Sequence, residues 1–229
     1  MRRFATIFAL AAGRKGGEAA LEVLLAETAP RSPAEIAATP DDRLLAEMTW
    51  RIFCAGFSSQ AIEGKWPGFE AAFDRRPARL RLHERCALRR ADQGTIRNGA
   101  KIRSVQVNAA FLVDLAEKHG SAARFFADWP DSDHVGLLDL LKKRASHLGG
   151  DSAGRFLRVI GKPAFIARPD VVAALIREGV LERPPGGKRD LAAIQAAFNR
   201  WAAESGRDLT SISRVLAMSI GEQGHGAPH

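Results

Sequence analysis

Asp170 is the carboxylate whose setting most suggests chemistry, because it follows a basic segment, a glycine turn and a short apolar helix. These features occupy residues 142–171, with the sequence KKRASHLGGDSAGRFLRVIGKPAFIARPDV. A carboxylate in the polar loop after Arg168 and Pro169 can stabilise developing positive charge or orient a water molecule. It can equally cap the helix expected over 171–177, and a capping aspartate keeps one oxygen free to interact with a positive charge or a water molecule.

The turn before this loop predicts an anion site. Gly149 and Gly150 lie where the backbone must turn sharply, and helical apolar spacing follows, with Asp151 or Ser152 as the expected cap. A helix N-terminus presents free N–H groups and a positive dipole end, which suit a phosphate. An ordinary helix-turn-helix corner would have the same pattern. The neighbouring residues that could meet the anion are Lys142, Lys143, Arg144, Ser152 and His147, and the histidine could also be a plain surface residue.

The charge of the chain indicates an anionic partner. Its 229 residues carry a formal net charge of +8, and the segment from Arg75 to Arg103 alone holds ten basic residues against two acids. Nucleic acid is the expected partner, and a membrane surface is the rival interpretation. Apolar residues interrupt the segment, so it is not typical of a disordered tail, although a solvated surface could have the same bias.

Cysteine content and hydropathy indicate the cellular compartment in which the protein is expected. Cys54 and Cys86 are too few for a disulfide framework and fit a reducing cytoplasm. No apolar run approaches the length that spans a bilayer. Residues 1–12 have features of a secretory signal, but the apolar stretch is short and runs into another helix, so we expect a packed helix there.

Helical periodicity recurs along the chain, and no segment alternates cleanly with period two. The chain is long enough to bury a sizeable core, and we therefore expect an all-α fold. A loop is expected at 125–130, and a break at Trp66-Pro67-Gly68. The helices are predicted over residues 3–13, 17–28, 34–38, 41–53, 61–65, 69–73, 102–115, 134–144, 152–160, 171–177, 191–201 and 209–220.

Three stretches together resemble the DNA-3-methyladenine glycosylase I family, a branch of the helix-hairpin-helix DNA glycosylase superfamily. Residues 92–112, DQGTIRNGAKIRSVQVNAAFL, match the family's glycine-isoleucine-arginine, lysine-isoleucine and asparagine-alanine spacing. Residues 44–59, LLAEMTWRIFCAGFSS, are similar to its helix that ends in alanine-glycine-apolar-serine. Residues 142–171 resemble the hairpin that grips the phosphate backbone and the loop acid that faces the flipped nucleotide.

The resemblance covers about residues 40–170 and implies a two-lobed helix-hairpin-helix glycosylase fold. The whole chain would then be a single domain. One lobe would hold the terminal helices, residues 1–40 with 172–229, and the other would hold the hairpin, residues 41–171.

The chain departs from the family pattern at several positions. Ser59 stands where the family has a tryptophan, and Arg51 stands where a glutamate contacts the alkylated base. An arginine would repel a cationic methylated purine. The cysteines and histidines of the family's structural zinc are missing, and His225 and His229 are too few for a tetrahedral site. We therefore expect no metal and no cofactor.

The base pocket that the resemblance implies must be built from the residues that are present. A flipped base needs a flat stacking surface and a polar group that reads its edge, although core packing is the other interpretation of each aromatic residue. The expected pocket residues are Trp50, Phe57, Trp66, Glu47 and Arg51. The expected catalytic residues are Asp170 and Glu63. In addition to the hairpin residues, the expected DNA contacts are Arg97, Asn98 and Lys101.

The resemblance thus implies a monofunctional DNA glycosylase that excises alkylated purines, similar to 3-methyladenine, in base excision repair. No lysine directly follows the hairpin helix, so strand cleavage is not implied. We expect a cytoplasmic monomer that binds double-stranded DNA and no membrane. The alternatives are a non-catalytic helix-hairpin-helix DNA-binding protein and a glycosylase of different lesion specificity that uses Asp170. A membrane-surface protein is a weaker third interpretation.

Overall fold

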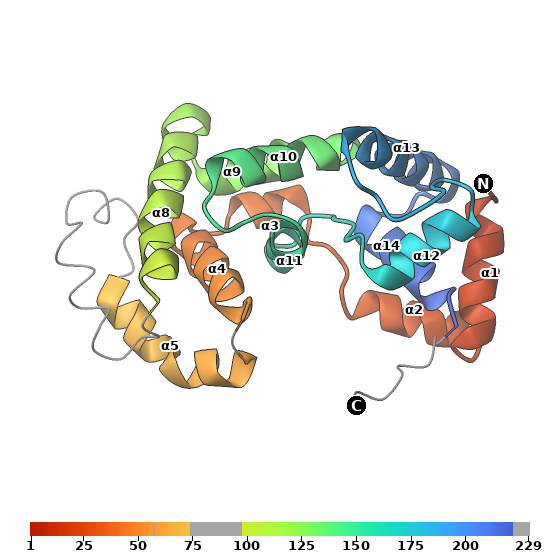
Figure 1. The fold of residues 1–229 in the computed structure, drawn as a ribbon, viewed down its shortest axis with the longest axis horizontal. Helices are drawn as coiled ribbons and strands as arrows, with labels where there is room; N and C mark the ends of the chain where they lie inside the picture. Colours follow the sequence, from red (N-terminus) through yellow and green to blue (C-terminus); the bar gives the residue numbers. More distant parts are fainter. Residues whose placement is uncertain (57, 74–97, 222–229) are drawn as a thin grey trace. The chain divides into compact units, whose positions relative to one another are not determined.

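The computed structural model describes residues 1–56, 58–73 and 98–221 (Figure 1). Every regular element in these ranges is helical, so the predicted all-α class is confirmed for them. The chain divides into two compact units. Unit 1 consists of residues 1–30, 131–135 and 163–229, and unit 2 consists of residues 31–130 and 136–162. The two lobes that the resemblance implies, with divisions near residues 40 and 171, stay a prediction; the units observed here change after residues 30, 130, 135 and 162.

Unit 1 packs its helices around α14. Helices α1, α12 and α13 all contact α14 (Figure 1), and Trp201 and Phe198 are fully buried in the apolar core of this unit. The N-terminal stretch buries Phe4 and Ile7 in this core, which confirms that it forms a packed helix. The elements of unit 1 are α1 (Phe4–Arg14), α2 (Glu18–Ala26), η1 (Asp131–Asp133), α12 (Pro169–Arg177), α13 (Lys188–Ser205) and α14 (Leu209–Met218).

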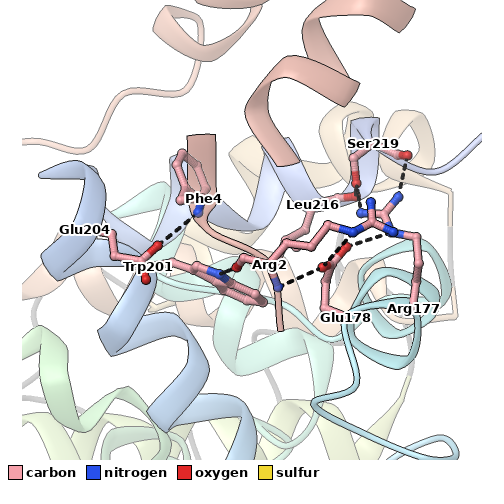
Figure 2. A network of polar contacts seen from close by, with 8 residues as sticks. All are labelled: Arg2, Phe4, Arg177, Glu178, Trp201, Glu204, Leu216 and Ser219. Atoms are coloured by element: carbon pink, nitrogen blue, oxygen red, sulfur yellow. Dashed lines mark hydrogen bonds and ion pairs between the residues drawn. The ribbon is translucent and has the colours of Figure 1, made fainter. Parts of the chain in front are cut away.

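A polar network ties the first residues of unit 1 to its later helices (Figure 2). The carboxylate of Glu178, whose side chain is fully buried, accepts hydrogen bonds from Arg177 Nε at 2.7 Å and from the backbone N–H of Arg2 at 3.3 Å. The guanidinium of Arg177 also donates to the carbonyl and the hydroxyl of Ser219, at 2.8 Å each. Trp201 Nε1 donates to the carbonyl of Arg2 at 3.1 Å. The network therefore joins the N-terminal segment, α12, α13 and the end of α14.

Unit 2 is organised around α4, which contacts α5, α8, α9 and α11. Its first residue, Asp41, accepts hydrogen bonds from the backbone N–H groups of Ala122 and Ala123, at 3.2 Å each, so α4 caps the start of α9. The elements are α3 (Pro33–Ala37), α4 (Asp41–Cys54), α5 (Ser59–Phe73), α8 (Gly99–His119), α9 (Ala122–Asp128), α10 (His134–Arg144, whose first two residues belong to unit 1) and α11 (Asp151–Val159).

Two predicted interruptions are wrong. Residues 125–130 were expected as a loop, but α9 includes Phe125 and Phe126, which are buried, and Ser121 caps it by accepting from the N–H of Arg124. The break expected at Trp66-Pro67-Gly68 is absent, because α5 continues through Pro67. By contrast, the short helix after Ser32 forms as predicted, with a full capping box between Ser32 and Glu35.

Candidate functional site

The helical hairpin of unit 2 consists of α10, the loop 145–150 and α11. Gly150 is the N-cap of α11, with φ 56° and ψ −134°, and no side chain caps the helix. The prediction that Asp151 or Ser152 caps the helix is therefore wrong, because both residues already lie inside its first turn. Because glycine has no side chain, the cap residue accepts no hydrogen bond from the N–H groups of that turn. An anion site at a helix N-terminus requires such N–H groups to be available. The helix closes with Lys162 N–H donating to the carbonyl of Leu157 at 2.8 Å.

A buried asparagine holds the hairpin loop in place. Asn108 on α8 is fully buried, and its side chain accepts from the N–H of Ser146 at 2.7 Å and donates to the carbonyl of Ser146 at 3.2 Å. The next residue, His147, has φ 60° and contacts the hydroxyl of Ser146 through Nδ1 at 2.9 Å. Sequence reasoning missed this role, although a polar residue on the apolar face of the helix expected over 102–115 was the available signal.

The basic residues beside the loop are mostly engaged within the protein. Lys143 pairs with Asp139 on its own helix, and Arg144 donates to Asp114 at 2.6 Å. Lys142 is exposed. The positive charge near the hairpin is therefore partly neutralised, and contacts of Lys143 and Arg144 with phosphate would require these pairs to open.

Two residues predicted to contact DNA cap helices in unit 2. Asn98 is the N-cap of α8 and accepts from the N–H of Lys101 at 3.1 Å. The ammonium group of Lys101 donates to carbonyls at the end of α4, those of Ile52 and Ala55. The predicted phosphate contacts of Asn98 and Lys101 stay predictions, and the hydrogen bonds that these side chains form within the protein do not favour them. Arg97 lies outside the described residues.

A cavity of about 680 Å³ opens in unit 2 beside the hairpin's second helix. Trp50 on α4 and Trp66 on α5 line it, with ring centroids 5.0 Å apart and ring planes at 73°. Val159 and Ile160, at the end of α11, line it too. A cavity of this size is within the range of small-molecule sites, and an edge-to-face pair of indoles offers one ring face for stacking.

Charged side chains share this cavity with the tryptophans. Glu47 lies on α4 with one oxygen 3.9 Å from Arg51 Nη2. Burial raises the pKa of Glu47, against the opposing effect of Arg51, Arg31 and Arg43. Among the described residues, the buried Nε of Arg51 has no hydrogen-bond partner. The cavity therefore combines a flat apolar surface with both donors and an acceptor.

The predicted pocket residues separate into three groups. Trp50, Trp66, Glu47 and Arg51 line one cavity. Glu63 is exposed on α5 and is not among the residues that line it. Phe57 lies outside the described residues.

Sequence reasoning missed two arginines of the cavity, Arg31 and Arg43. The spacing of Arg43, Glu47 and Trp50 on α4 was a usable signal, because helical positions three and four apart share a face. Arg31 carried no such signal. Its N–H donates to the carbonyl of Gly161 at 3.0 Å, and a Cβ on that glycine would lie 2.5 Å from Arg31 Cγ.

Asp170 lies in unit 1, exposed in the first turn of α12. The N-cap is Arg168 and Pro169 is the first helical residue, so the alternative that Asp170 caps the helix is wrong. A carboxylate in the first turn interacts favourably with the helix dipole, and the residue is exposed to solvent. Its predicted catalytic role stays a prediction.

The chain matches no protein-family model, and it has no significant match among curated proteins or among solved structures. Within residues 1–56, 58–73 and 98–221, no group of three or more histidine, cysteine, aspartate or glutamate side chains could hold a metal ion. No helix in this part of the chain is long and apolar enough to cross a membrane.

Replacing Gly149 with glutamate tests whether the hairpin turn meets phosphate. A Cβ at this exposed position would approach only Lys142 Cγ, at 3.9 Å, and the left-handed backbone that disfavours side chains is at Gly150 instead. We expect affinity for duplex DNA to fall about fivefold, because a negative charge near a phosphate costs on the order of 1 kcal/mol at the surface. Fluorescence anisotropy with a labelled duplex measures this change. Gly149→Gln, which adds the same bulk without charge, is the control, and equal losses in both variants would argue against a phosphate contact.

Proposed function

We propose that the protein is a monofunctional DNA glycosylase of the helix-hairpin-helix class. In this reaction the C1′–N bond of a damaged purine nucleotide breaks, the base leaves with the bonding electrons, and water supplies a hydroxyl group to C1′. The remaining proton of the water goes to solvent when the nucleotide was cationic, and to the departing base when it was neutral. The resemblance implies alkylated purines, similar to 3-methyladenine, as substrates. One observation carries the proposal: the end of the hairpin's second helix and the Trp50–Trp66 pair line the same cavity in unit 2.

The roles proposed for the residues follow from their chemistry. The backbone of Gly149, Gly150 and Ser152 would bind phosphate, and the two tryptophans would stack on the extruded base. For Asp170 the resemblance implies a role of its own, the stabilisation of positive charge on the sugar. The net charge of +8 supports an anionic polymer as partner. Lys162 supports the assignment as monofunctional, because its ammonium group donates to the carbonyls of Trp129 and Ala127 and is not placed as a nucleophile.

A non-catalytic DNA-binding protein is the second candidate, and Arg51 is the observation that favours it. A cationic methylated purine would meet this guanidinium inside the cavity, where the family that the chain resembles has a carboxylate. Loss of the reaction with retention of the hairpin would explain this substitution.

The experiment that tests the proposal measures release of free purine from alkylated duplex DNA and from a duplex that contains hypoxanthine. We expect release from at least one of them. We also expect the logarithm of duplex affinity to fall with the logarithm of salt concentration, with a slope of about −0.9 for each phosphate neutralised. Binding without release would favour the second candidate, and a flat salt response would remove nucleic acid as the partner.

A further inference from the structure

The charge lining the cavity is unsuited to a cation. Three arginines, Arg31, Arg43 and Arg51, line it against two glutamates, Glu35 and Glu47. The carboxylate of Glu35 already accepts from the N–H of Ser32 at 2.8 Å and from its hydroxyl at 2.7 Å, within the capping box of α3. Glu47 is the remaining carboxylate, and the positive charges of all three arginines act on it.

The hydrogen bonding of Arg51 indicates that the described residues of the cavity lack an acceptor for its guanidinium group. Its Nε is buried, and no described residue accepts a hydrogen bond from it, while Nη2 is 3.9 Å from Glu47, beyond good hydrogen-bond length. A buried donor without an acceptor is costly. The guanidinium would therefore gain by turning its N–H edge toward an acceptor that enters the cavity. The matching ligand edge carries two acceptors side by side, as O6 and N7 of a 6-oxopurine do, and arginine binds that edge with two parallel hydrogen bonds.

We propose that this cavity binds a neutral 6-oxopurine of the hypoxanthine type, with the base against Trp50 and Trp66 and its O6/N7 edge facing Arg51. The inference rests on the proposed function and replaces the cationic lesion that the resemblance implies. Hypoxanthine arises from adenine when water replaces the 6-amino group and ammonia leaves. Its weaker pairing makes it less costly to extrude than a correctly paired base.

The test uses the full chain and three free bases, so it does not depend on DNA binding or on bond cleavage. The bases are 9-methylhypoxanthine, neutral 9-methyladenine without a carbonyl group, and the 3,9-dimethyladeninium cation. Binding is followed by tryptophan fluorescence and by calorimetry. We expect 9-methylhypoxanthine to bind roughly tenfold more tightly than either other base, the discrimination typical of one bidentate arginine.

Two variants at one position separate charge from geometry. Arg51→Met removes the guanidinium, and Arg51→Lys keeps the charge but loses the planar pair of donors. Both are expected to lose most of the preference for 9-methylhypoxanthine, with near-ultraviolet circular dichroism confirming that they fold. Arg124→Met is the matched control, because Arg124 is exposed on α9 of the same unit and pairs with Asp128. It should keep the wild-type preference.

The outcomes separate this inference from the proposed function. Preference for the cation, full retention in Arg51→Met, or no saturable binding of any base would each overturn the inference. If hypoxanthine-type binding is found but no base is released from either duplex, the inference stands and the enzyme proposal fails. Release from alkylated DNA, with tighter binding of the cation, would keep the enzyme and overturn the inference.

Discussion

Replacing Arg177 with methionine is expected to lower the free energy of unfolding by about 3–5 kcal/mol, because it leaves a buried carboxylate without its main partner. The side chain of Glu178 is 0% exposed and that of Arg177 is 25% exposed. The variant also removes both hydrogen bonds from Arg177 to Ser219, which join α12 to the end of α14 (Figure 2). Urea denaturation followed by circular dichroism and tryptophan fluorescence measures the change.

The control for this variant is Arg200→Met, in the same unit. Arg200 pairs with Glu204 one helical turn away, and its side chain is 54% exposed. A pair of this kind contributes little to stability, because water and salt screen it. Similar losses in both variants would show that the buried network does not stabilise unit 1 more than an ordinary surface pair does.

Replacing Asp170 with asparagine is expected to slow base release at least about tenfold in single-turnover experiments, while duplex DNA binds as well as before or more tightly. In the proposed role the carboxylate would oppose the phosphates when DNA binds and would stabilise the positive sugar of the transition state, so the variant would lower only the rate. Asparagine keeps the shape, and the exposed side chain forms no cap in α12, so stability should change little.

Asp190→Asn is the control for this experiment. Asp190 also lies in the first turn of a unit 1 helix, α13, and accepts from the N–H of Gly186 at 2.8 Å. It should leave the rate of base release unchanged. If Asp170→Asn also keeps the full rate, the chemistry belongs wholly to the base pocket, and if the wild-type protein releases no base, the chain is a DNA-binding protein without this activity.

Local signals in the sequence predicted most helices, and nonlocal contacts explain the errors. Ser32 and Glu35 predict the start of α3, because both residues of its capping box lie within one turn. The seven residues of α9 are too few for a clear periodic signal, and its first N–H groups are satisfied by Asp41, 81 residues earlier. Tertiary support of this kind leaves no local trace.

The candidate site shows the same division between local and nonlocal information. Glu47, Trp50 and Arg51 lie along one helix, so their shared cavity could be predicted from helical spacing. Arg31 and Val159 come from segments far apart in the chain, and only the fold brings them to that cavity. The unpaired Nε of Arg51 depends on burial, which a sequence does not give.

The composition of unit 1 has a consequence for synthesis on the ribosome. The N–H of Phe4 donates to the carboxylate of Glu204, 200 residues later, and the apolar face of α1 packs against α13 and α14. At about 5–20 residues per second, α1 must wait roughly 10–40 s before these partners are made. Unit 2 ends at residue 162 and can fold during that interval. During that interval α1 can pack only against α2, and the part of its apolar face that contacts α13 and α14 in the folded chain stays uncovered.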